Sequence, residues 1–210
     1  MTTYTKELQQ KLSPADAIEI LKEGNNRFVN SKREDRNLLQ QVKETAEGQN
    51  PFAIILSCID SRTSSELIFD LGIGDVFNAR IAGNIVNDDI LGSMEFACKV
   101  AGSKLIVVLG HTSCGAIKGA CDHVELGNLT GLVNKIAPSV EAIDYQGEKS
   151  SKNKEFVELV AQENVRRAVQ LIKEKSPILN EMIKNGEIGI VGGMYDVKSG
   201  AVEFYSAEVA

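Results

Sequence analysis

The chain has 210 residues, 43% of them hydrophobic, which is enough to bury the core of one α/β domain, so we expect a single domain over 1–210. Its 23 basic and 29 acidic residues give a net charge of -6, which offers no basic surface for nucleic acid or for an anionic membrane. We find no apolar run of membrane-spanning length and no signal-peptide pattern at the start, and therefore expect a cytoplasmic protein.

The first 50 residues are expected to form a helical arm. Ser13 and Pro14 mark a helix start, with serine as N-cap and proline in the first turn. The apolar stripe that follows is interrupted at 24–26. The charged segment 30–50 predicts at most a short surface helix, which either packs on a partner subunit or remains a solvated arm.

From Pro51 onward, apolar segments of strand length alternate with helical patterns. Strands are predicted over 52–58, 75–81 and 104–110, and 187–206 reads as a buried strand, a turn and a short return strand. Helices are predicted over 64–72, 87–100, from 115 onward, and over 129–143, 154–175 and 177–186. Strands separated by helices imply right-handed crossovers, so residues 51–210 should form an α/β core: a mostly parallel central sheet flanked by helices, with a C-terminal hairpin strand.

Two predicted strands end in residue types that bind metals. One apolar strand ends at Cys58, and the β-branched run 105–110 is followed by His111 and Cys114. Because ligand sites in open parallel sheets lie outside the carboxyl ends of the strands, these three side chains should converge. Two cysteines and one histidine leave the fourth position of a tetrahedral zinc open, as a catalytic site requires.

A fourth cysteine or histidine would instead make the site structural, and the candidates are Cys98, Cys121 and His123. Cys98 lies in the apolar stripe of its helix and is expected to be a small buried hydrophobe. Cys121 and His123 lie about two to three helical turns beyond Cys114, too far along a helix to reach the same ion. We therefore predict an open zinc site.

Asp60 and Arg62 follow Cys58 at every second position, which in an extended segment places these side chains on one side. A carboxylate beside a zinc-bound hydroxide can accept its hydrogen bond. A guanidinium paired with that carboxylate would hold it ionised and in place. The alternative interpretation is a capping aspartate with a surface arginine.

Taken together, three segments resemble the signature sequences of the β-class carbonic anhydrases. They are 58–62 (CIDSR), 77–84 (FNARIAGN) and 110–115 (GHTSCG), within a similarity that spans roughly residues 49–136. Ile59 and Thr63 stand where the family more often has a small or polar residue and a valine.

The resemblance implies one Zn²⁺ per chain on Cys58, His111 and Cys114, with Asp60 and Arg62 as the catalytic dyad. The implied reaction is the reversible hydration of carbon dioxide to bicarbonate and a proton by zinc-bound hydroxide.

The same resemblance implies a substrate pocket at a subunit interface, and hence a homodimer or a homotetramer. Gln49 would hydrogen-bond the substrate, and Phe77 and Phe96 would line the apolar pocket for carbon dioxide. Ala82 and Gly115 complete the implied substrate site.

Three alternatives remain at the level of sequence. The same zinc site could hydrolyse carbon disulfide or carbonyl sulfide, or zinc could merely stabilise a non-catalytic module. The absence of a convincing fourth ligand and the presence of Asp60 and Arg62 argue against the module. A thiol redox protein is disfavoured because the chain has no Cys-x-x-Cys sequence.

Overall fold

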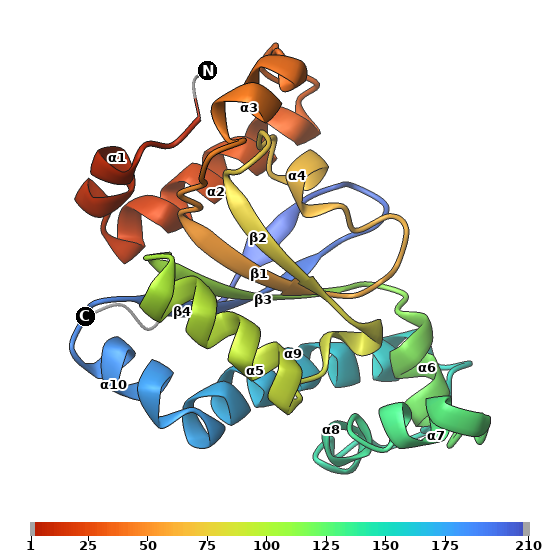
Figure 1. The fold of residues 1–210 in the computed structure, drawn as a ribbon. Coiled ribbons are helices and arrows are strands. Elements are labelled where there is room, and N and C mark those ends of the chain that lie inside the picture. The colour runs from red at the N-terminus through yellow and green to blue at the C-terminus, as the bar shows by residue number, and fades with distance from the viewer. Residues whose placement is uncertain (1–2, 208–210) are drawn as a thin grey trace.

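Within residues 3–207, the part of the chain that the computed structural model describes, five strands form one sheet in the order β2-β1-β3-β4-β5 (Figure 1). The first four strands are parallel and β5 returns antiparallel to β4. This confirms the predicted α/β fold with a hairpin at its end. The strands are β1 (Ala53–Ser57), β2 (Val76–Arg80), β3 (Leu105–His111), β4 (Gly189–Tyr195) and β5 (Val202–Phe204).

Helices cover both faces of the sheet (Figure 1). Before and around β1 lie α1 (Lys6–Lys11), α2 (Pro14–Val29), α3 (Leu38–Glu44) and α4 (Ser65–Ile68). Between β2 and β3 lie the short turn η1 (Ala82–Asn84), α5 (Asp88–Glu95) and the π-helical turn η2 (Phe96–Val100). After β3 come α6 (Gly115–Cys121), α7 (Gly127–Val133), α8 (Ala137–Glu141), α9 (Lys154–Lys175) and α10 (Pro177–Lys184).

Strand β1 shows why the sheet is buried on both sides. Ile54 and Leu56 belong to the apolar cluster formed with α5, α6, α9 and α10, whereas Ile55 belongs to the cluster formed with α2 and α4. Successive side chains of a strand point to opposite faces, so a continuous apolar run is needed where both faces carry helices. Strands β1, β3 and β4 are accordingly buried along their whole length.

Helix α2 begins where the sequence predicts but does not break at 24–26. The Ser13 hydroxyl accepts a hydrogen bond from the Asp16 amide at 3.1 Å, and the Asp16 carboxylate accepts one from the Ser13 amide at 2.9 Å. Gly24 lies directly against the Phe69 carbonyl, where a Cβ would collide with the oxygen. The glycine permits this close approach of two backbones and does not end the helix.

Other predicted boundaries were also wrong. The segment predicted as one helix over 129–143 is two helices. Hydrogen bonds of the 3-10 type close the chain at Lys135 and Ile136, and Pro138 lies in the first turn of α8. The helix predicted over 64–72 ends at Ile68, because Asp70 adopts a left-handed conformation with φ 47°. Helix α1 was not predicted.

Asp70 joins the N-terminal helices to the sheet layer. Its side chain is fully buried and accepts hydrogen bonds from Arg27 Nε and Arg36 Nη1, each at 2.6 Å. Burial raises the pKa of Asp70, but hydrogen bonds from Arg27 and Arg36 and from a backbone amide outweigh it and hold this pKa below its ordinary value. Asp70 therefore remains ionised between its arginines.

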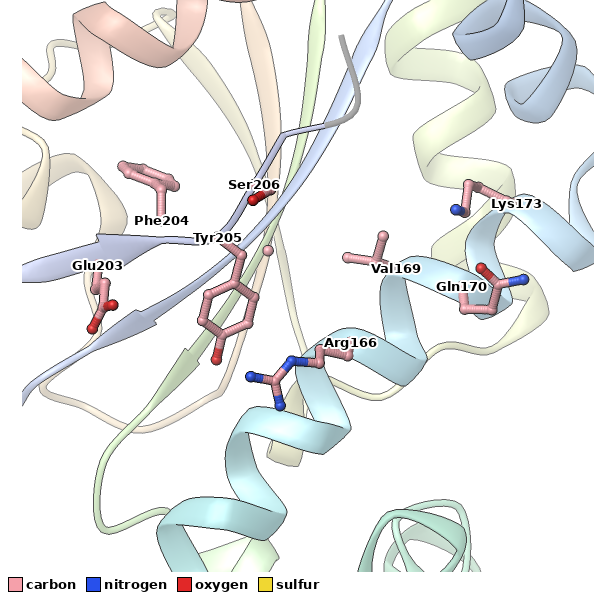
Figure 2. Close-up of a pocket in the computed structure, with 9 residues that line it drawn as sticks. Arg166, Val169, Gln170, Lys173, Glu203, Phe204, Tyr205 and Ser206 are labelled. Atoms are coloured by element: carbon pink, nitrogen blue, oxygen red, sulfur yellow. The ribbon is translucent and has the colours of Figure 1, made fainter. Parts of the chain in front are cut away.

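A groove of about 580 Å³ lies between α9 and the β5 edge (Figure 2). The Arg166 guanidinium lies over the Tyr205 ring, 5.0 Å from its centroid. None of the residues that the sequence singled out lines this groove. Within residues 3–207, none of the helices has the length and apolar character needed to cross a bilayer.

Replacing Gly24 by alanine should lower the free energy of unfolding by about 1–3 kcal/mol, because the added methyl group forces α2 away from Phe69. Gly131→Ala in α7 is the matched control: nothing lies within 4 Å of its Cβ position, so alanine should add about 0.5–1 kcal/mol. Urea unfolding of both variants measures the difference. Equal effects of the two substitutions would contradict the steric explanation.

Asp70→Asn should reduce the free energy of unfolding near neutral pH by on the order of 3 kcal/mol, since it breaks a buried ion pair. The folded-state pKa of Asp70 is lowered, so its stabilisation is present above the unfolded pKa of about 4 and is lost as pH falls through the folded value. Urea unfolding between neutral and acid pH should therefore show a shallower acid loss in the variant than in the wild type. The same substitution at the exposed Asp144 should leave the wild-type profile unchanged.

Candidate metal centre

The structure brings Cys58, His111 and Cys114 together at the carboxyl edge of the sheet. Cys58 directly follows β1, His111 is the last residue of β3, and Cys114 is the N-cap of α6. Their ligand atoms lie within 4.8 Å of one another and all three side chains are buried. In residues 3–207 this group contains no further cysteine, histidine or carboxylate, so Cys98, Cys121 and His123 stay outside it.

The geometry of this cluster suits a tetrahedral zinc ion. The Cys58 and Cys114 sulfurs are 4.0 Å apart, close to the roughly 3.8 Å expected for two thiolates on one zinc. His111 Nδ1 donates a hydrogen bond to the Thr112 carbonyl at 3.0 Å, since a carbonyl can only accept. This fixes the tautomer in which Nε2, a buried atom without a hydrogen-bond partner, presents its lone pair to a metal.

The two thiols influence each other's ionisation. A hydrogen bond from Cys114 lowers the pKa of Cys58, and the hydrogen bond from the Gly83 amide lowers it further. The neighbouring Cys58 sulfur and burial raise the pKa of Cys114. The pair therefore readily carries one negative charge, and a bound cation would be needed to stabilise the second thiolate.

Asp60 and Arg62 form a bidentate ion pair beside this cluster. Arg62 Nε and Nη2 donate to the two carboxylate oxygens of Asp60 at 2.9 and 2.8 Å. The Arg62 hydrogen bonds hold the pKa of Asp60 well below its usual range. Asp60 Oδ2 lies 4.0 Å from His111 Nε2, so an ionised carboxylate sits next to the position that a metal would occupy.

Arg80 and Thr63 hold the segment that carries Cys58 and Asp60, a role that the sequence did not predict for either residue. Arg80 donates to the Cys58 carbonyl at 3.0 Å and to the Asp60 carbonyl at 2.7 Å. The Thr63 hydroxyl lies 3.1 and 2.8 Å from the same two carbonyls. Arg80 ends the neighbouring strand, opposite Ser57. Because the contacts are made to backbone oxygens, no pattern in the sequence linked these residues.

Helix α9 contributes two further polar contacts that the sequence did not reveal. Glu158 accepts a hydrogen bond from the Ser113 amide at 2.9 Å, and Asn164 donates to the Gly83 carbonyl at 2.8 Å. A signal existed for Asn164, because it is a polar residue at a position within the predicted apolar stripe of α9.

Gln49, Phe77 and Phe96 do not gather at the metal ligands of their own chain. Gln49 precedes the amino end of β1, whereas Cys58 follows its carboxyl end, and a five-residue strand spans roughly 17 Å. Phe77 and Phe96 meet edge to face, with centroids 6.2 Å apart, in a groove of about 730 Å³ that none of the three ligands lines.

Ala82 and Gly115 lie nearer to the cluster. Ala82 begins η1, whose next residue, Gly83, donates its amide to the Cys58 sulfur at 3.4 Å. Gly115 follows Cys114 as the exposed first residue of α6. Of the five predicted substrate residues, Gly115 adjoins a ligand in the chain and Ala82 adjoins the residue whose amide contacts the Cys58 sulfur.

Comparison with known proteins agrees with this geometry. Residues 53–202 match the family model described as carbonic anhydrase. Carbonic anhydrase 2 of Mycobacterium tuberculosis is 37% identical over 194 residues, covering 90% of this chain and 91% of the relative. A carbonic anhydrase of Mycolicibacterium smegmatis is 33% identical, covering 92% and 94% of the two chains.

Solved structures agree as well. A β-carbonic anhydrase of Aspergillus fumigatus matches with a TM-score of 0.68 and 25% identity, covering 91% of this chain and 90% of that one. One of two tetrameric β-carbonic anhydrases from Sordaria macrospora matches with a TM-score of 0.69 and 24% identity, covering 91% and 98%. The chain therefore belongs to the β-class carbonic anhydrases, zinc enzymes that hydrate carbon dioxide to bicarbonate.

Proposed function

We propose that Cys58, His111 and Cys114 hold the catalytic zinc and that Asp60 and Arg62 are the catalytic dyad. The observation that carries this proposal is the bidentate Asp60–Arg62 pair, with its carboxylate 4.0 Å from His111 Nε2. A purely structural zinc site would need a fourth protein ligand and no such pair.

Each residue then has a defined task. When bound, zinc supplies a water that ionises near neutral pH and can attack carbon dioxide. Asp60, being ionised, can only accept a hydrogen bond, so it orients that water and directs a lone pair toward the substrate. Arg62 holds the carboxylate in this orientation and keeps it charged. The buried ligands keep competing solvent away from the sulfurs.

We expect Asp60→Asn to retain one zinc per chain but to lower kcat/KM for carbon dioxide hydration by a factor on the order of 10²–10⁴. The amide keeps the size of the side chain but loses the charge and can donate a hydrogen bond where an acceptor is needed. Metal analysis and stopped-flow hydration assays measure the two quantities. Asp144→Asn, which makes the same change at an exposed site, should behave like the wild type. Unchanged activity of Asp60→Asn would rule out the dyad.

We further propose that Gln49, Phe77 and Phe96 serve the zinc site of a neighbouring subunit. They lie away from the ligands of their own chain, and Phe96 leaves 54% of its surface exposed beside the edge strand β2. Val100, on the same helical turn, is 73% exposed. Apolar exposure next to an unpaired strand edge suits a contact between two copies of the chain. A homodimer, or a homotetramer like the Sordaria macrospora relatives, would complete each site.

Mixed oligomers test this arrangement. Gln49→Ala alone should lose about 10- to 100-fold in kcat/KM through one missing hydrogen bond, and Cys58→Ser alone should be inactive. A mixed dimer contains one Gln49→Ala chain and one Cys58→Ser chain. The zinc site of the first chain then lies beside the unchanged Gln49 of the second, so about half of wild-type activity should return. Two affinity tags isolate the mixed species for the hydration assay. No recovery would place Gln49 at the zinc of its own chain.

We also propose that the protein works in a reducing compartment, the cytoplasm. All four cysteines are free and buried, and two of them belong to the metal cluster. Thiols that must remain available to a metal suit a compartment in which disulfides do not persist.

A further inference from the structure

We propose that Asn164, in the middle of α9, is a positioning residue for the zinc ligand Cys58 and acts through the backbone of Gly83. Asn164 Nδ2 donates a hydrogen bond to the Gly83 carbonyl at 2.8 Å, and the Gly83 amide donates to the Cys58 sulfur at 3.4 Å. Asn164 is 4% exposed. The inference rests on the proposed zinc site, and it assigns a metal-tuning task to a helix that supplies no ligand.

The turn that presents the Gly83 amide is strained. Gly83 has φ 66° and Asn84 has φ 42°, so two successive residues are left-handed, and the second is an asparagine, for which this conformation costs free energy that it does not cost a glycine. Gly83 is also tightly enclosed: a Cβ there would lie 2.6 Å from Ile136 and 3.2 Å from Ala116. A strained turn keeps its shape only where surrounding contacts hold it. The bond from Asn164 is one such contact, made from a distant and rigid element.

The environment of Asn164 indicates that its polar group has a specific task. It lies in the buried stripe of α9, with Val160 one turn before it and Ala168 one turn after it. Packing alone would be served by an apolar residue of similar size, because burying an amide costs free energy unless it is hydrogen-bonded. The Asn164 carbonyl oxygen faces the Ser139 hydroxyl at 3.4 Å, so both ends of the amide are engaged.

An amide that donates to a metal-bound thiolate draws electron density from the sulfur. The sulfur then donates less to the metal, which retains more positive charge and polarises its remaining ligand more strongly. By fixing the Gly83 carbonyl, Asn164 keeps the neighbouring amide directed at Cys58. Loss of Asn164 should therefore make the Cys58 sulfur a stronger donor and leave it less precisely placed.

Cobalt substitution provides a readout of this sulfur. In Asn164→Leu we expect the thiolate-to-cobalt charge-transfer bands to move to lower energy, because the sulfur becomes a stronger donor. A chelator competition should show about 10-fold weaker metal binding, because the loss of precise placement of Cys58 outweighs its stronger donation. Ser139→Ala, which removes only the other contact of Asn164, should keep the wild-type band positions. Val160→Ala, which weakens the packing of the same helix, should also keep them. Unshifted bands in Asn164→Leu, or an equal shift in Val160→Ala, would overturn the proposal.

A second measurement does not depend on how well the variant folds. In wild-type protein loaded with a magnetically active cadmium isotope, the Gly83 amide proton should show coupling to the metal across its hydrogen bond with Cys58. Absence of this coupling would also overturn the proposal. Zinc content and hydration activity are measured alongside on wild-type protein loaded with zinc. Full zinc without hydration would refute the proposed catalysis and leave the spectroscopic result on Asn164 intact.

Discussion

Parallel pairing of β1 with β3 is the contact on which the metal centre depends. Their register places Ser57 beside Leu109. Cys58, which directly follows β1, and His111, which ends β3, therefore lie at the same carboxyl edge of the sheet. Both strands are apolar and fully buried, which makes a slip in register costly. Ligands far apart in the sequence are thus fixed by the most rigid part of the molecule, and Cys114 needs only a short turn to join them.

Around this rigid pair, polar side chains from elsewhere in the fold hold the loops. Arg80 and Thr63 secure the segment after β1 through its carbonyls. Helix α9 reaches both ligand segments, through Glu158 on one side and Asn164 on the other. Irregular segments carry the chemistry, and regular elements determine where their atoms lie.

Much of the fold followed from local patterns in the sequence. Apolar runs of strand length predicted the buried strands, and the Ser-Pro pair predicted the start of α2. The errors arose where tertiary contacts overrule local preference. Gly24 looks like a helix breaker but permits a close contact with Phe69. The left-handed Asp70 that ends α4 is held by Arg27 of α2 and by Arg36 of the segment before α3.

For the site, the sequence by itself determined the residue types: a thiol at the end of one strand, an imidazole and a thiol after another, and a carboxylate with a guanidinium beside the first. These are local features, and they predicted a common site because ligand sites in parallel sheets lie at the carboxyl ends of the strands. Only the tertiary structure decided which residues hold the ligands in place. Arg80, Gly83 and Asn164 act through backbone N–H and C=O groups, which occur in nearly every residue type and therefore leave no pattern in the sequence. It also decided that Gln49 lies at the wrong end of β1 for its own zinc, since the length of a strand separates them.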